Sequence, residues 1–169
     1  MSERSKDNNI FDLGEVPSIK ELRFGIVVAD WNLEISENLL IGCKDALKKI
    51  GVLETNVHII HVPGSVELIH GAKLLIDLGR FDAIICLGCI LKGETPHFEI
   101  IAHAVAKGVV DLNMEAAIPT IFGVLTPNTI EQARERSGRQ FGNKGMEAAV
   151  TAIKMIMVQQ ELQEKSEHN

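Results

Sequence analysis

The chain has 169 residues, a length that suits one domain with a substantial hydrophobic core. Hydrophobic residues make up 46% of it and charged residues 24%, as in ordinary globular proteins. The formal net charge is −6 and the basic residues are scattered, which argues against a protein that neutralises nucleic-acid phosphates.

The predicted elements alternate between strands and helices along the chain. After a polar arm over 1–20, we expect a strand at 22–29, a helix at 33–50, a strand at 57–62, a helix at 65–78, a strand at 81–91, a helix at 96–114 and a strand at 119–125. Thr126-Pro127 is expected to open a further helix, and Asn143 to cap the last one.

This order predicts an α/β fold, a three-layer α/β/α sandwich around a central, mostly parallel, four-stranded sheet. One domain is expected over 21–160, followed by a polar tail at 161–169. In such folds ligands bind beyond the carboxyl ends of the strands. The segments there are 30–32, 62–67, 89–97 and 122–126.

A Cys-x-x-Cys pair, Cys86 and Cys89, lies in the third predicted strand. Redox or metal chemistry would need the two sulfurs to converge. Residues three apart on a strand point to opposite faces, so we interpret both as small buried side chains. The histidines at 58, 61, 70, 103 and 168 show no spacing typical of metal ligands, and we predict no metal site.

The segment Gly93-Glu-Thr-Pro-His97 follows that strand directly. Thr95 can cap the next helix and Pro96 suits its first position. Free N–H groups and the helix dipole there favour an anion such as phosphate. The dipole also disfavours an imidazolium, which makes His97 a candidate base. The alternative is a surface histidine beside a helix cap.

Three other strand-end features each have two interpretations. Trp31, the only tryptophan, could stack on a planar ligand or pack at the sheet edge. Ser65 and Glu67 could bind ligand hydroxyls, or cap a helix and match its dipole. Arg136 could bind a phosphate through its fork of donors or be a solvated surface residue.

Cysteine usage and the N-terminus bear on the compartment. Three cysteines without framework spacing predict a reducing environment. The polar N-terminus lacks the apolar core of a signal peptide, and no apolar run approaches the length of a membrane span. We therefore expect a cytoplasmic protein without a membrane partner.

In combination, these segments resemble the 6,7-dimethyl-8-ribityllumazine synthases from Leu22 to about Met157. The matching stretches are FGIVVADWN at 24–32, VPGSVEL at 62–68, LGCILKGETPHFE at 87–99, PTIFGVLTPNTIEQARERSG at 119–138 and GNKGMEAA at 142–149. The resemblance implies a flavodoxin-like sandwich and a transferase of riboflavin biosynthesis. Such an enzyme condenses 5-amino-6-(D-ribitylamino)uracil with 3,4-dihydroxy-2-butanone 4-phosphate to give 6,7-dimethyl-8-ribityllumazine, phosphate and water. No metal or organic cofactor is implied.

The resemblance also implies roles for individual residues. His97 matches the acid/base that moves protons. Matching substrate contacts on the pyrimidine and ribityl side are Trp31, Ser65, Val66, Glu67, Cys89, Ile90 and Leu91. Those on the phosphate side are Glu94, Thr95 and Arg136, with Phe122 donated across a subunit boundary. Supporting positions are Asn32, Lys144 and Glu147, of which Glu147 is expected to orient His97.

The chain departs from the family pattern at four positions. Trp31 stands where Phe is commoner, Val66 where a bulkier aromatic often lies, Cys89 where Thr is frequent and Lys92 where Arg is usual. The smaller Val66 weakens an expected ring contact. None of the four changes removes a group that the chemistry needs.

The resemblance implies a homo-oligomer: a pentamer, and in many members an icosahedral shell of twelve pentamers, with riboflavin synthase as a candidate cargo. The short link Ser137–Gly142 lacks the insertion of free-pentamer members, which favours the shell.

Two hypotheses compete with the synthase. The first is a flavin-binding or shell-forming relative with little catalysis, and the second is a generic flavodoxin-like binding module. The joint presence of His97, Arg136 and the Gly-Glu-Thr loop argues against the first, and the second would not explain why all the motifs coincide.

Overall fold

A computed structural model describes residues 13–14, 16–138 and 142–167. Its central layer is a four-stranded sheet in the order β2–β1–β3–β4. The strands are β1 (Phe24–Ala29), β2 (Val57–Val62), β3 (Ala83–Cys89) and β4 (Thr120–Leu125), and every pair is parallel. Both central strands are buried along their whole length, as expected where helices cover both faces.

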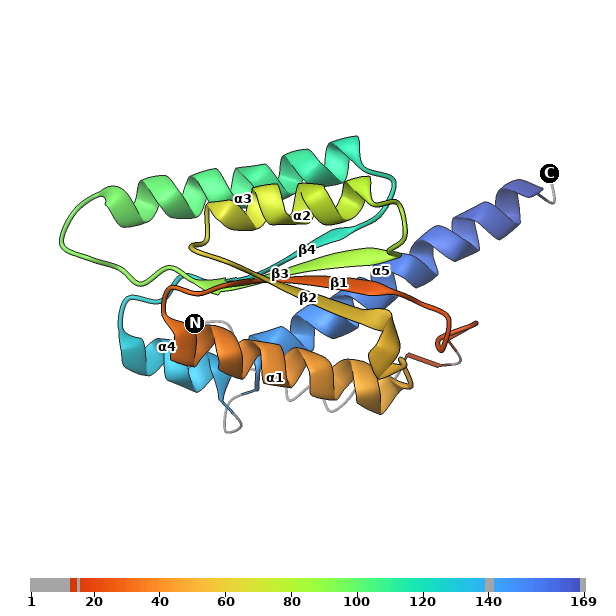
Figure 1. Cartoon of the computed structure of the whole chain (residues 1–169), viewed down its shortest axis with the longest axis horizontal. Helices are drawn as coiled ribbons and strands as arrows, with labels where there is room; N and C mark the ends of the chain where they lie inside the picture. The colour runs from red at the N-terminus through yellow and green to blue at the C-terminus, as the bar shows by residue number, and fades with distance from the viewer. Residues whose placement is uncertain (1–12, 15, 139–141, 168–169) are drawn as a thin grey trace.

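Helices cover the two faces of the sheet unequally (Figure 1). One face carries α2 (Glu67–Asp77) and α3 (His97–Glu115). The other carries α1 (Leu33–Ile50), α4 (Ile130–Ser137) and α5 (Lys144–Glu167), and a 3₁₀ turn at Glu54–Asn56 precedes β2. The predicted three-layer α/β/α sandwich is confirmed, and its sheet is wholly parallel.

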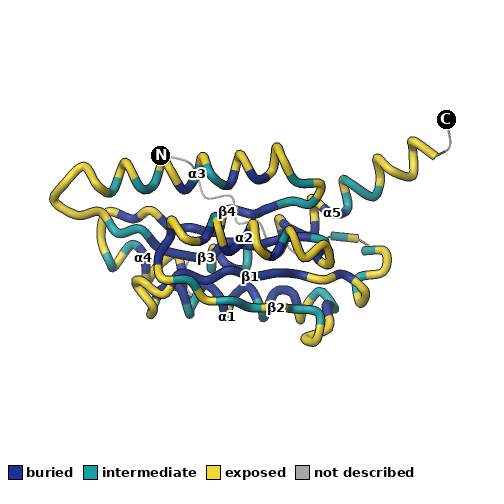
Figure 2. Tube along the Cα trace, turned by 45° about the horizontal axis from the view of Figure 1, so that its top comes forward, coloured by how far each residue is buried: buried dark blue, intermediate teal, exposed yellow. Residues whose placement is uncertain are grey.

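The strands divide their side chains between two hydrophobic clusters, one under each helix layer. Figure 2 shows the central strands β1 and β3 as buried segments of the chain. Ile85 packs towards α1 and α5, whereas its neighbours Ile84 and Cys86 pack towards α2 and α3. This alternation arises because successive strand residues point to opposite faces. Cys89 belongs to the α1/α5 cluster, so the thiols of Cys86 and Cys89 diverge, as predicted.

The helix predicted to open at Thr126-Pro127 begins later. Its N-cap is Thr129, whose hydroxyl accepts a hydrogen bond from the amide of Gln132 at 3.3 Å. The Gln132 side chain in turn accepts from the amide of Asn128 at 2.9 Å. The prediction was wrong because this reciprocal cap supplies a stronger helix start than a proline at the first position does.

The two other predicted caps have opposite outcomes. Thr95 does not cap α3, because the N-cap position is Pro96, with helical backbone angles, and no side chain accepts there. Asn143 does cap α5, and its side-chain oxygen accepts from the amide of Gly145 at 2.8 Å.

The last helix, α5, continues to Glu167 through residues predicted as a polar tail, and its final turns project beyond the sheet (Figure 1). The predicted arm at 1–20 and the link Ser137–Gly142 lie partly outside the described residues. Within the described ranges, no helix is long and apolar enough to cross a membrane.

Candidate functional site

A cavity of about 340 Å³ lies beyond the carboxyl ends of β1 and β3. We call it the tryptophan cavity. Its lining is Trp31, Asn32, Ser65, Val66, Cys89, Ile90, Leu91, Gly93, Thr95, His97, Phe98 and Ile101. The chain order of the sheet reverses between β1 and β3, and this is where open α/β sheets bind ligands.

Trp31 lies in the loop between β1 and α1, which is attached to the neighbouring strand. The amide of Asp30 donates to the carbonyl of Val62 at 2.8 Å, and the amide of Trp31 donates to that of Pro63 at 3.1 Å. Trp31 nevertheless remains 68% exposed. A fixed backbone that carries an exposed, flat ring beside a cavity is suited to stacking on a planar ligand.

Asn32 connects the two strand ends that flank the cavity. Its backbone has φ 60° and ψ 45°, in the left-handed region that asparagine tolerates better than most residues. Its side-chain amide donates to the carbonyl of Cys89 at 2.9 Å. This contact supports the expected supporting role of Asn32, because it sets the spacing between the loop after β1 and the end of β3.

The segment after β2 contributes unequally to the cavity. Ser65 is buried and lines it, and Val66 lines it with 45% of its surface exposed. Glu67 is exposed at the start of α2 and is not part of the lining. No side chain caps α2, so the interpretation of Ser65 as a helix cap is wrong.

The Gly-Glu-Thr-Pro-His segment runs along the cavity rim. Thr95 and His97 line the cavity, whereas Glu94 is exposed outside its lining. His97 is the first residue of α3, as expected of a residue in the first helical turn. No side chain of the described residues caps α3 or accepts from its first-turn N–H groups, which favours an anion there.

Cys89, the last residue of β3, and the two residues after it, Ile90 and Leu91, line the cavity. The amide of Ile90 donates to the carbonyl of Leu125 at 2.8 Å, which joins this strand end to β4.

Burial raises the pKa of the Cys89 thiol to about 11 and that of Cys86 to about 12. Both thiols therefore stay protonated at neutral pH, unlike reactive or metal-binding cysteines. Over 13–14, 16–138 and 142–167, no group of three or more His, Cys, Asp or Glu residues could hold a metal ion.

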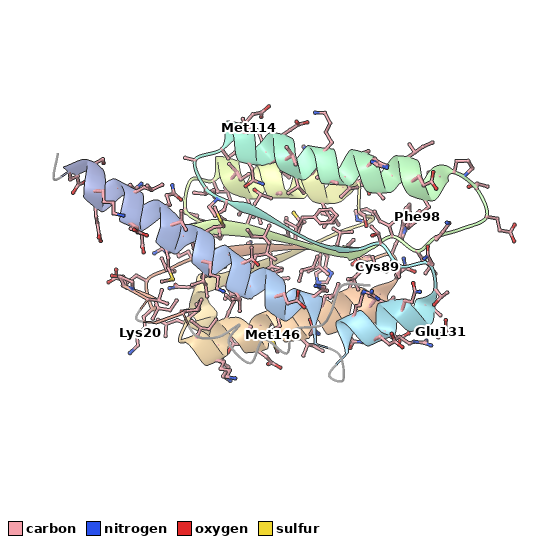
Figure 3. The ribbon with its side chains drawn as sticks, turned by 180° about the vertical axis from the view of Figure 1, so that it is seen from behind. Lys20, Cys89, Phe98, Met114, Glu131 and Met146 are labelled. Carbon is pink, nitrogen blue, oxygen red and sulfur yellow. The ribbon has the colours of Figure 1, made fainter. Side chains whose placement is uncertain are left out.

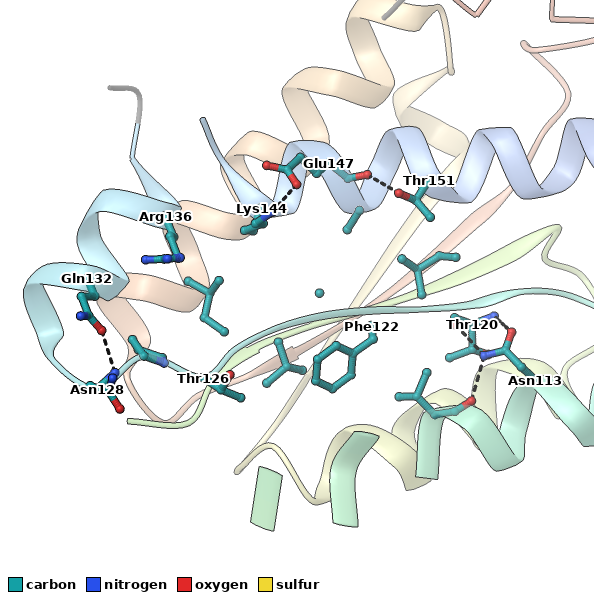
Figure 4. Close-up of a pocket in the computed structure, with 17 residues that line it drawn as sticks. Asn113, Thr120, Phe122, Thr126, Asn128, Gln132, Arg136, Lys144, Glu147 and Thr151 are labelled. Carbon is teal, nitrogen blue, oxygen red and sulfur yellow. Dashed lines mark hydrogen bonds and ion pairs between the residues drawn. The ribbon is translucent and has the colours of Figure 1, made fainter. Parts of the chain in front are cut away.

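A second and larger cavity, of about 860 Å³, lies along the outer edge of β4 (Figure 4). We call it the arginine cavity. It is lined by Val109, Asn113, Thr120, Ile121, Phe122, Gly123, Val124, Leu125, Thr126, Pro127, Asn128, Gln132, Arg136, Lys144, Glu147, Ala148 and Thr151. Four predicted site residues are therefore gathered here rather than in the tryptophan cavity: Phe122, Arg136, Lys144 and Glu147.

The charges in the arginine cavity leave one cation available. Lys144 forms an ion pair with Glu147 across one turn of α5. Arg136 forms no ion pair with any described residue. By contrast Arg134, two residues earlier, makes a two-pronged contact with Glu34 on α1, at 2.9 and 3.0 Å. Among the described residues, Arg136 is therefore the cation of this cavity without a carboxylate partner, which suits it to bind an anion.

The two cavities of one chain share no lining residue. Glu147, predicted to orient His97, lies in the arginine cavity, whereas His97 lies in the tryptophan cavity. Phe122, on edge strand β4, is 40% exposed, which is high for an aromatic side chain on a strand. Most predicted site residues thus fall into two groups, one in each cavity, whereas Glu67 and Glu94 line neither.

Some lining residues were not predicted from the sequence. Phe98 and Ile101 lie near the start of α3, which begins beside the tryptophan cavity. Figure 3 shows Phe98 and Cys89 at the same end of the molecule. Thr129 and Gln132 have the spacing of a capping box, a signal that could have placed a helix start here, and Gln132 and its partner Asn128 line the arginine cavity.

Comparison with known proteins gives the same family over nearly the whole chain. The family model described as 6,7-dimethyl-8-ribityllumazine synthase matches residues 21–160. Proteins of that name are 48% identical in Parabacteroides distasonis, over 86% of this chain and 91% of the relative, and 49% identical in Bacteroides fragilis, over 80% and 94%. The relative in Flavobacterium psychrophilum is 45% identical, over 95% and 85%.

A match of this extent, together with strand-end residues gathered at the switch point of a parallel sheet, places the chain in the 6,7-dimethyl-8-ribityllumazine synthase family.

Proposed function

We propose that this chain is a 6,7-dimethyl-8-ribityllumazine synthase. It condenses 5-amino-6-(D-ribitylamino)uracil with 3,4-dihydroxy-2-butanone 4-phosphate and releases phosphate and water, the penultimate step of riboflavin biosynthesis. The observation that carries this proposal is the family match over 21–160, with Trp31, Ser65 and His97 lining one cavity.

The pyrimidine substrate belongs in the tryptophan cavity. Its ring stacks on the exposed indole of Trp31, and the backbone at Cys89–Leu91 binds its polar edge. The buried hydroxyl of Ser65 and the carboxylate of Glu67 serve the ring and the ribityl chain. Two features support this arrangement: Trp31 is exposed while its backbone is fixed, and Cys89, Ile90 and Leu91 line the cavity.

The phosphate group is bound between two positive features. One is the N-terminus of α3, preceded by Glu94 and Thr95, where no side chain takes the first-turn N–H groups. The other is Arg136, whose guanidinium has no carboxylate partner among the described residues. The phosphate is both the group by which the enzyme binds this substrate and the leaving group. The same contacts therefore stabilise the departing charge.

His97 moves protons while the amine of the pyrimidine forms a Schiff base with the ketone and expels a first water, phosphate is eliminated, and the ring closes with loss of a second water. Its place at the first residue of α3 sets it beside the phosphate position. Most of the acceleration comes from holding two substrates in one geometry, and proton transfer adds the smaller part.

The complete site forms between subunits of a pentamer. Phe122 and Arg136 line the same cavity, so both cross the boundary together and face the tryptophan cavity of the next subunit. This arrangement is supported by the absence of any shared lining residue within one chain and by the exposure of Phe122 on an edge strand. Glu147 and Lys144 then approach His97 from the neighbouring subunit.

The enzymatic assay uses the purified chain mixed with both substrates, while the fluorescence of the lumazine product is recorded. We expect a rate well above that of the spontaneous condensation. A rate equal to the spontaneous one would reject the enzyme and would favour the flavin-binding or shell-forming alternative. A flavin titration of the same preparation would then test that alternative directly.

The shared site is tested by mixing two impaired chains. Co-expressed His97→Ala and Arg136→Ala subunits form wild-type sites only if His97 and Arg136 come from different chains. In a random equal mixture, roughly a quarter of the sites would then be intact. Activity of the mixed assembly above the mean of the two separate variants supports the shared site, and activity equal to that mean rejects it.

The assembly extends from the pentamer to an icosahedral shell, with riboflavin synthase as its candidate cargo, in the cytoplasm. The shortness of the link Ser137–Gly142 supports the shell. Sedimentation velocity and electron microscopy should find particles of twelve pentamers. A preparation that contains only free pentamers would reject the shell and leave the enzymatic proposal intact.

A further inference from the structure

The orientation of the Trp31 ring is not explained by its backbone contacts alone. The hydrogen bonds from Asp30 to Val62 and from Trp31 to Pro63 fix the main chain at this point. They leave the indole free to rotate about its side-chain bonds, and 68% of the residue is exposed. Something else must hold the ring beside the tryptophan cavity.

Gly64, in the loop between β2 and α2, lies directly against this ring. A Cβ atom built on Gly64 would stand 2.9 Å from Cε3 and 3.1 Å from Cζ3 of Trp31. Both distances are shorter than carbon atoms in contact normally adopt, about 3.5–4.0 Å. Gly64 is buried, and its φ angle lies outside the left-handed region. Its backbone would therefore accept an alanine, and the indole is what excludes a side chain.

We propose that Gly64 is a positioning residue of the active site, because its missing side chain leaves the space in which the six-membered ring of Trp31 rests. The second atom near that space is the Glu67 carboxylate oxygen Oε2, 2.9 Å from the same Cβ position. That oxygen ends a flexible side chain and can rotate away, whereas a rigid bicyclic ring must move as a whole. The inference rests on the proposed stacking of the pyrimidine on Trp31.

The exposure of Trp31 decides what a side chain at Gly64 would do. A ring enclosed by the core would resist displacement, and the fold would be destabilised. An exposed ring can instead swing towards solvent. Gly64→Ala should therefore preserve folding, move the indole away from the cavity and raise the KM for the pyrimidine substrate by about fivefold, the size of one lost ring-stacking contact. The kcat and the KM for the phosphate substrate should stay within about twofold.

The matched control is Gly108→Ala on α3. A Cβ there would also meet a side chain closely, at 2.7 Å from Cγ1 of Ile69, but Gly108 is outside both cavities. Trp31 is the only tryptophan, so the emission spectrum and its quenching by acrylamide report on this ring alone. We expect both to change in Gly64→Ala and to stay at wild-type values in Gly108→Ala. Far-UV circular dichroism and unfolding midpoints confirm that each variant is folded.

A double-variant cycle with Trp31→Ala separates this inference from the proposed function. If Trp31→Ala leaves the KM for the pyrimidine unchanged, the stacking role fails, and the catalytic part of this inference fails with it. If Trp31→Ala raises that KM while Gly64→Ala leaves KM and emission at wild-type values, the positioning role of Gly64 is rejected and the stacking role of Trp31 stands. If Gly64→Ala still raises KM in the Trp31→Ala background, it acts through Glu67 or the loop, which also overturns the inference. Support requires that its effect disappear in that background.

Discussion

At the scale of single residues, the place of a residue on its helix decides whether its side chain reaches a cavity, and residue type alone does not. His97 and His103 both lie on α3 and both are exposed, but only His97 is at the first residue of the helix and lines the tryptophan cavity. Arg134 and Arg136 lie two residues apart on α4, yet one is paired with Glu34 and the other faces the arginine cavity.

His97→Ala should lower kcat by at most about 100-fold, because general acid/base help is the smaller part of this acceleration. The measurement is the steady-state rate with both substrates saturating. His103→Ala, further along the same helix and outside the tryptophan cavity, is the control and should keep the wild-type rate. A wild-type kcat in His97→Ala would rule out proton transfer by His97.

Arg136→Ala should raise the KM for the phosphate substrate by about tenfold or more, the usual effect of losing a hydrogen-bonded charge. The KM for the pyrimidine should change little. Arg134→Ala is the matched control, since it removes an arginine that is bound to Glu34 and lies outside the cavity. Equal effects of the two variants would show that only the general charge of α4 matters.

At the scale of elements, one side chain joins three helices. Asn143 caps α5 by accepting from the amides of Gly145 and Met146, at 2.8 and 3.2 Å. Its amide group donates to the carbonyl of Asn38 on α1 at 2.9 Å and to that of Ser137 at the end of α4 at 2.7 Å. This residue therefore fixes where α4, which carries Arg136, lies against α1 and α5.

Asn143→Ala should lower the free energy of unfolding by about 2–3 kcal/mol, from the lost cap and the unsatisfied carbonyls. Urea titrations at one protein concentration measure it, since subunit assembly makes stability depend on concentration. Asn143→Asp keeps the capping oxygen but loses both donors, and should fall between wild type and alanine. A loss below about 0.5 kcal/mol in the alanine variant would contradict this role.

At the scale of the whole molecule, the buried thiols make stability depend on alkaline pH. Burial raises the pKa of Cys43 and Cys86 from 9.0 to about 12. In the unfolded chain the same thiols ionise near their ordinary pKa. The unfolded state therefore releases protons first, so the contribution is fully present below pH 9 and is lost as the pH rises towards 12.

The free energy of unfolding should accordingly fall between pH 9 and pH 11, at up to about 1.4 kcal/mol per pH unit for each thiol. The control is the double variant Cys43→Ala/Cys86→Ala. It should be less stable at pH 8, because the replacements leave small cavities, but its stability should decline less steeply with pH. Identical slopes in the two proteins would exclude the thiols as the cause.

Much of the fold follows from local sequence pattern. Continuous apolar runs predicted both buried central strands, and helical spacing predicted α1 over Leu33–Ile50, because buried faces repeat with the period of the element that forms them. Where the prediction depended on which of several competent residues caps a helix, it succeeded at Asn143 and failed at Thr95 and at Thr126-Pro127. Capping is decided by a few hydrogen bonds that neighbouring segments can redirect.

By itself, then, the sequence determined the order of the strands and helices, the parallel sheet and the residues at its carboxyl end, since these depend on periodicity and on chain direction. Only the tertiary structure decided how those residues are grouped. Trp31 and His97 share one cavity and Phe122 and Arg136 another, because the sheet order separates β1 and β3 from the outer edge of β4. The contact of Gly64 with the Trp31 ring likewise depends on the packing of two loops, which no local pattern encodes.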